Sequence, residues 1–84
     1  MRPSDEYVFP IGPLQRQAEL RQPGRVTDYD LAALVELSYR QIQRWRHDQH
    51  GRLSFVQADH AAVAMGLHPV HLWGDLWLTQ AVTS

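Results

Sequence analysis

The stretch "LAALVELSYRQIQRW", residues 31–45, decides the fold that we predict for this chain. Two short helical patterns meet in it with a connection of only three or four residues. The first pattern ends near Leu37, and the second begins after Ser38, whose hydroxyl suits the N-cap position of a helix. A connection this short is typical of two helices that cross around a small residue, here Ala32 or Ala33.

The second helix of this corner has two chemically different faces. Ile42 and Trp45 are three positions apart, share one face and are predicted to be buried. Because they point inward, the opposite face must point outward, and it is polar and basic. Arginine can make a paired contact to guanine and glutamine to adenine, so this face suits a DNA groove, although a face that is merely solvated would look similar. Its members are Tyr39, Arg40, Gln43, Arg44 and His47.

The rest of the chain reads as further short helices without a competing strand pattern. Pro3, Pro10 and Gly12 indicate an irregular N-terminal arm over residues 1–12, so that the domain proper would span residues 13–84. Leu14, Ala18 and Leu20 are at helical spacing. The fold class that we predict is all-α, a compact globule of five helices over residues 13–22, 28–37, 38–49, 55–65 and 69–82.

Capping residues mark where these helices begin and end. Thr27 and Ser54 are N-cap candidates, and Asp30, three residues after Thr27, makes an approximate capping box. Gly66 suits the position after a helix, and His68 is a candidate cap beside Pro69.

Composition restricts the protein to a few classes. Eighty-four residues make one small domain, and the absence of cysteine excludes disulfides and thiolate metal sites. No apolar run approaches the roughly 20 residues that span a bilayer, and the polar, proline-rich start is unlike a secretory signal, so we expect a cytoplasmic protein. The net charge of −1 conceals an uneven distribution, because residues 37–52 hold four arginines against one aspartate.

The quoted stretch resembles the helix-turn-helix of the lambda-repressor-like superfamily, which includes phage repressors and Cro proteins. The matching features are Leu31-Ala32, Val35 and Leu37, Ser38 at the start of the second helix, Ile42 in its middle and Trp45 one turn on. The segment "LSFVQADHAAVAMGLHPVHLWGDLW" follows the plan of the family's later helices, and the resemblance covers about residues 14–78. "MGLHPVHLW" in particular is similar to small DNA-binding proteins of actinobacteria and their phages.

The chain departs from the family pattern in two places. The turn often contains glycine in the family, whereas here that position is Glu36, which would adopt the left-handed conformation at a cost of about 1 kcal/mol unless the turn differs. Asp28 and Asp30 flank the start of the preceding helix, where they would repel a phosphate turned toward them.

The resemblance implies a double-stranded DNA-binding transcriptional regulator, a phage-type repressor or Cro-like protein, with the helix at residues 38–49 in the major groove. The outward residues Tyr39, Arg40, Gln43, Arg44 and His47 would contact bases. Phosphates would be held by Ser38, Arg46, His50 and Arg52.

Two alternatives remain open at this point. One is a recombination directionality or architectural DNA-binding factor from a phage, and the other is a protein–protein interaction module such as an antitoxin-like domain. The apolar last helix favours the second in part, because Trp73, Trp77 and Leu78 could either complete the core or form a homodimer surface.

Catalytic and metal chemistry find no support in the sequence. The pairs His47/His50 and His68/His71 have short spacing but lack a cysteine or an acidic partner that would complete a site. There is no nucleophile–base pattern and no glycine-rich phosphate loop, so we expect no enzyme activity, no cofactor, no metal and no small-molecule substrate.

Overall fold

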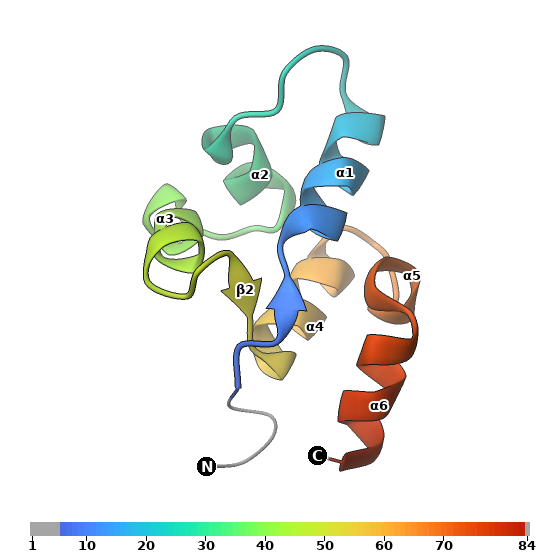
Figure 1. Ribbon diagram of the computed structural model, residues 1–84. Coiled ribbons are helices and arrows are strands. Elements are labelled where there is room, and N and C mark those ends of the chain that lie inside the picture. The colour runs from blue at the N-terminus through green and yellow to red at the C-terminus, as the bar shows by residue number, and fades with distance from the viewer. Residues whose placement is uncertain (1–5, 84) are drawn as a thin grey trace.

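A computed structural model describes residues 6–83 of the chain, with six helices and a two-stranded sheet among them (Figure 1). The mainly helical class predicted from the sequence is confirmed, and the small sheet is an addition to it. In chain order the elements are β1 (Phe9–Pro10), α1 (Gly12–Arg21), α2 (Asp28–Leu34), α3 (Tyr39–His47), β2 (Arg52–Leu53), α4 (Phe55–Ala64), α5 (Val70–Trp73) and α6 (Asp75–Thr83).

The predicted N-terminal arm is wrong for its last residues, which belong to the folded domain. Strand β1 pairs antiparallel with β2, Phe9 lying opposite Leu53. The Val8 and Ile11 amides donate to the carbonyls of Leu53 and Gly51, at 3.1 and 2.9 Å. Pro10 is tolerated because both strands of a two-stranded sheet are edge strands, where a proline need not donate an N–H. Its side chain is exposed, while the adjacent Phe9 and Ile11 are buried. Residues 1–5 of the predicted arm lie outside the described residues.

The corner between α2 and α3 has the geometry that the sequence indicates. Glu36 has φ of 58°, the left-handed conformation expected of it. The Leu37 amide donates to the Ala32 carbonyl at 3.0 Å and the Glu36 amide to Ala33 at 3.3 Å, which is the Schellman arrangement that ends a helix. Ser38 then caps α3, its hydroxyl accepting from the Gln41 amide at 3.2 Å. The chain therefore turns between the two helices within four residues.

The other predicted caps are present as well. Thr27 and Ser54 each form a full capping box, with Asp30 and Gln57 as the reciprocating side chains. Gly66 ends α4 with φ of 75°. The His68 ring accepts from the Val70 amide through Nδ1 at 3.1 Å, so it satisfies an N–H at the start of α5.

The last predicted helix is divided in two. Gly74 has φ of 56° and ψ of −127°, which lies outside the helical region, and it separates α5 from α6. A glycine inside a helical pattern is compatible with either a continuous or a broken helix, so the periodicity of the flanking residues did not reveal the break. The predicted count of five helices is wrong for this reason.

Aromatic side chains from distant parts of the chain meet in the core. The Phe9 ring lies 5.5 Å from the ring of Trp73 and 5.6 Å from that of Trp77, while Phe55 stacks on Trp77 at 4.2 Å. The Trp73 indole N–H donates to the Pro10 carbonyl at 2.9 Å. Such contacts bury large apolar surfaces and satisfy the one polar atom of the indole.

This cluster corrects the self-association surface predicted on the last helix. Trp73 and Trp77 are both buried, because β1 covers them, whereas Leu78 is 51% exposed. Of the three residues predicted for a homodimer, only Leu78 therefore remains on the surface. Leu20, which is at helical spacing with Leu14 and Ala18, is 81% exposed, whereas the other two are fully buried.

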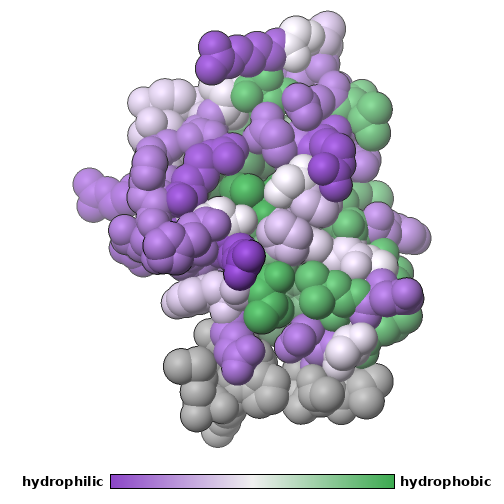
Figure 2. Space-filling view, in the orientation of Figure 1, coloured by the Kyte–Doolittle hydropathy of each residue, from purple (hydrophilic) through white to green (hydrophobic). Residues whose placement is uncertain are grey.

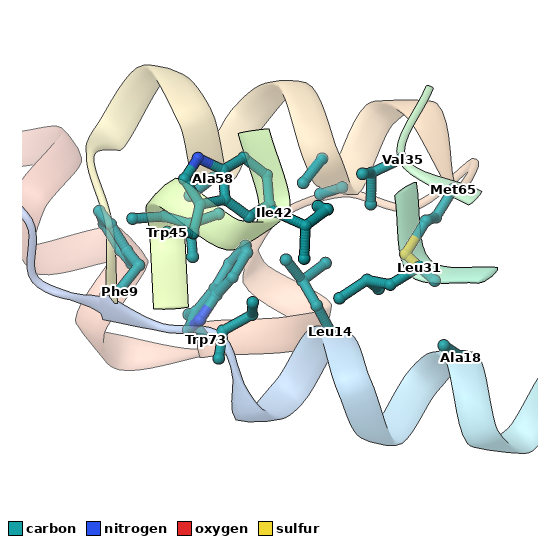
Figure 3. Close-up of a cluster of buried hydrophobic side chains, with 14 of the residues drawn as sticks. Phe9, Leu14, Ala18, Leu31, Val35, Ile42, Trp45, Ala58, Met65 and Trp73 are labelled. Atoms are coloured by element: carbon teal, nitrogen blue, oxygen red, sulfur yellow. The ribbon is translucent and has the colours of Figure 1, made fainter. Parts of the chain in front are cut away.

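The remaining core lies between the first four helices. Figure 3 shows Leu14 of α1 and Ile42 of α3 pointing toward the same interior, with Leu31 of α2 and Met65 beside them. Leu14, Leu31 and Ile42 are fully buried, and so is Trp45, the largest of the fully buried side chains. Among residues 6–83 there is no helix of the length and apolar character needed to cross a bilayer.

The capping box at the start of α2 makes stability depend on pH. Hydrogen bonds from the backbone amide of Thr27, then from its hydroxyl and from the Gln22 side chain, lower the pKa of Asp30 below its ordinary value of 3.8. A carboxyl whose pKa is lowered by folding stabilises the fold above its unfolded pKa, and this contribution is lost as pH falls through the lower folded value.

We therefore expect Asp30→Asn to be less stable than the wild type at neutral pH, with the difference shrinking as pH falls below 3.8. Asparagine retains an oxygen that can accept from Thr27 but carries no charge. Urea unfolding over a series of pH values measures this. A difference that stays constant through the acid range would mean that the charge of Asp30 contributes nothing.

Candidate nucleic-acid interface

The two faces predicted for α3 are present in the structure. Ile42 and Trp45 are fully buried, and Arg40, Arg44 and His47 are exposed on the other side. Hydrophilic residues gather on the side of the molecule where α3 lies, the left in Figure 2. A shallow hollow of about 350 Å³ runs along this face, lined by Arg40, Gln43, Arg44, His47 and Asp48.

Arg40 and Arg44 are the available cations of this face. They are four residues apart and therefore lie on one side of the helix. Within residues 6–83, neither guanidinium makes a hydrogen bond or an ion pair with another residue. An unpaired arginine on a surface keeps all five of its N–H donors for a ligand.

Gln43 and Arg46, by contrast, are engaged with Asp28 at the start of α2. The Gln43 amide nitrogen donates to Asp28 Oδ2, and Arg46 Nε donates to Asp28 Oδ1 at 2.7 Å. Arg46 Nη2 also donates to Gln15 Oε1 on α1 at 3.0 Å. His47 Nε2 lies 3.1 Å from Gln43 Oε1. We call these five residues, Gln15, Asp28, Gln43, Arg46 and His47, the Asp28 network.

The Asp28 network changes two of the predicted roles. Arg46, predicted to bind phosphate, is half-buried and already paired, so it is not a free cation. Gln43, predicted to contact a base, is directed at α2. Sequence reasoning missed Gln15, and it saw Asp28 only as a charge that repels phosphate. The partners are 15 to 31 positions apart, and no local pattern signals pairing over that distance.

Tyr39 lies at the edge of this face and stacks on Tyr29 of α2. Their ring centroids are 4.0 Å apart with an interplanar angle of 10°, and both side chains are exposed. One face of the Tyr39 ring is therefore covered, although the residue as a whole remains 39% exposed. The two tyrosines border a larger hollow of about 680 Å³ that reaches Arg25 and Glu19.

The remaining predicted phosphate contacts are found at both ends of α3. Ser38 is exposed at the N-terminal end, where its hydroxyl is the cap. His50 and Arg52 are exposed beyond the C-terminal end, and His50 has φ of 55°, followed by Gly51 with φ of 74°. These two left-handed residues turn the chain from α3 into β2, so Arg52 emerges beside the helix rather than farther along its axis.

No histidine cluster forms a metal site within the described part of the chain, where no three histidine or acidic residues are grouped suitably. The rings of His68 and His71 are 6.4 Å apart and meet edge to face. His60 of α4 is exposed.

Comparison with known proteins adds no family: no family model, curated protein or solved structure matches this chain.

Proposed function

We propose that α2, the turn and α3 act as a helix-turn-helix that binds double-stranded DNA, with α3 in the major groove, and that the protein regulates transcription. The observation that carries this proposal is the exposed, unpaired pair Arg40 and Arg44, held opposite the buried Ile42 and Trp45. Burial of one face fixes which residues the helix offers to a ligand.

The dimensions and the turn support the same function. An α-helix with its side chains is about 10–12 Å in diameter, and the major groove, about 12 Å wide, admits it. The Schellman turn at Glu36 joins α2 to α3 through four residues, and the bonds of Gln43 and Arg46 to Asp28 hold the two helices together. A helix held in this way can present its side chains to base edges in one orientation.

The local charge also supports binding to a polyanion. Asp28, the acid nearest the start of α2, is paired with Arg46, so its charge is compensated before a phosphate approaches. Three exposed arginines lie within 13 residues of one another along the chain: Arg40, Arg44 and Arg52. The one exposed acid between them is Asp48, which borders the same hollow as Arg40 and Arg44. Because charges are screened beyond about 10 Å, this local excess matters more than the net charge of −1.

Within this function, Arg40 and Arg44 contact base edges, assisted by Tyr39 and His47. The DNA phosphates are bound by Ser38, His50 and Arg52. Regulation follows from occupancy alone, by blocking polymerase or another factor. The test is selection of bound sequences from a random duplex pool, followed by a gel shift with the selected duplex. Failure to enrich any sequence would favour a protein–protein module or a sequence-independent DNA-binding factor.

Arg44→Ala should weaken binding to the selected duplex by about 1–3 kcal/mol and relax the preference at one or two base pairs. The reason is that Arg44 is exposed on the face opposite Ile42 and has its donors free. Fluorescence titration against the selected duplex and single-substitution duplexes measures both quantities.

Arg52→Ala is the matched control, since it removes an exposed arginine outside α3. It should weaken binding to the selected duplex and to random duplexes almost equally. It should also reduce the slope of log affinity against log salt concentration by about one unit. If Arg44→Ala behaves in the same way as Arg52→Ala, then Arg44 contacts phosphate and does not discriminate between bases.

A further inference from the structure

Resting on the proposed function, we infer that the DNA site is recognised through two guanines, contacted by Arg40 and Arg44, and that the Asp28 network withdraws Gln43 from adenine recognition. The sequence alone suggests a DNA site that contains both guanine and adenine, because arginine and glutamine occur together on the outer face of α3. The contacts of the folded chain leave only the arginines for paired base contacts.

The orientation of the Gln43 amide is determined by its partners. Asp28 Oδ2 can only accept a hydrogen bond from it, so the amide nitrogen of Gln43 must face α2. The amide oxygen then faces His47 Nε2, which must donate, at 3.1 Å. Both functional ends of the amide are therefore occupied within the protein.

Adenine recognition needs both of these ends at once. A glutamine pairs with adenine by donating its N–H to N7 while its oxygen accepts from N6. Gln43 could do this only by breaking its hydrogen bonds to Asp28 and to His47 at the same time. That would leave Asp28 with Arg46 alone and His47 without its partner, so the rearrangement opposes binding to an adenine-containing site.

Asp28 is itself held in place from two directions. Arg46 Nε donates to Oδ1 at 2.7 Å, a short charge-assisted bond, and Arg46 is fixed in turn by Gln15 of α1 at 3.0 Å. The carboxylate thus joins α2 to α3 directly and to α1 through Arg46, and its second oxygen accepts from Gln43. The position of the Gln43 amide is therefore a consequence of how α1, α2 and α3 pack.

Arg40 and Arg44 have the opposite character. Both are exposed and have no bonding partner in residues 6–83, and each fork can donate two parallel hydrogen bonds to O6 and N7 of guanine. Four residues along a helix correspond to about 6 Å. Base pairs are about 3.4 Å apart, so the two guanines should be separated by about two base-pair steps.

Selection from a random duplex pool tests the inference with four proteins besides the wild type: Arg40→Ala, Arg44→Ala, Gln43→Ala and Gln41→Ala. Gln41 is the matched control for Gln43, because it is a half-buried glutamine of the same helix but borders a different hollow, next to Val56 and His60. Circular dichroism melts establish that each variant is folded.

The expected wild-type motif contains two guanines, and each arginine variant loses discrimination at a different one of them, by about tenfold. Gln43→Ala should retain both guanine positions, as Gln41→Ala does. An adenine position that is present in the wild-type motif and absent with Gln43→Ala would overturn the inference, as would a motif without guanines. If the wild type enriches no sequence at all, the proposed function fails instead, and the two failures are therefore distinguishable.

Discussion

Replacing Trp45 with alanine is expected to remove a large part of the protein's free energy of unfolding and to lower its melting temperature sharply. Trp45 is the largest fully buried side chain, and it borders a hollow that Val56 and His60 of α4 also line. Truncating a tryptophan in a core costs about 3–5 kcal/mol, and a domain of this size has a total stability of about 4–13 kcal/mol. The indole N–H has no hydrogen-bond partner among the described residues, which reduces the net contribution and places the expected loss near the lower end.

Thermal melts followed by circular dichroism measure this loss. The control is Arg44→Ala, one position away, whose exposed side chain should change stability by less than about 0.5 kcal/mol. Trp45→Phe is a second variant, because it removes the unpaired N–H but keeps an aromatic ring and should remain folded. If Trp45→Ala melts as the wild type does and yet no longer binds DNA, Trp45 faces the groove, and the assignment of the outer face of α3 is wrong.

Phe9→Ala should have an effect of similar size, about 3–5 kcal/mol, although the residue precedes the first helix. Its ring is fully buried and contacts three others, Phe55, Trp73 and Trp77. Removing it leaves a cavity at the centre of the aromatic cluster and exposes the tryptophans that β1 covers. The expected result is a lower melting temperature together with a red shift of tryptophan fluorescence.

The matched control for Phe9 is Tyr7→Ala, since Tyr7 is an aromatic residue two positions earlier that is 49% exposed. It should melt within a few degrees of the wild type. A chain that begins at residue 13 should fail to fold for the same reason that Phe9→Ala is destabilised. If the shortened chain instead has the wild-type melting temperature, the strand pair is dispensable and residues 1–12 are an arm, as the sequence alone suggested.

Much of the fold depends on signals that lie within four residues of one another, and these could be predicted. Thr27, Ser38 and Ser54 were recognised as caps because the side chain that caps a helix and the amide it satisfies are close along the chain. The burial of Ile42 and Trp45 followed from helical periodicity. Periodicity says less about burial where a helix is partly uncovered: Leu20 is at helical spacing with Leu14 and Ala18, yet its side chain is 81% exposed.

The candidate site divides in the same way. The exposure of Arg40 and Arg44 is a property of α3 alone, and it was predicted once Ile42 and Trp45 were placed inside. The engagement of Gln43 and Arg46 depends on where α2 and α1 lie, because Asp28 and Gln15 reach them only across helix interfaces. The same applies to Tyr39, whose partner Tyr29 belongs to the preceding helix.

By itself the sequence determined the first four helices, their caps, the left-handed turn at Glu36 and the two faces of α3, since each depends on steric and hydrogen-bonding rules between near neighbours. Only the tertiary structure decided that Phe9 pairs its strand with Leu53, 44 positions away, that Trp73 and Trp77 face inward beneath it, and that Asp28 holds Gln43. Contacts of this kind form between residues whose separation along the chain carries no periodic signal. They exist because helices and strands must bury their apolar faces against one another, and the polar residues beside those faces then take whichever partners the packing brings within reach.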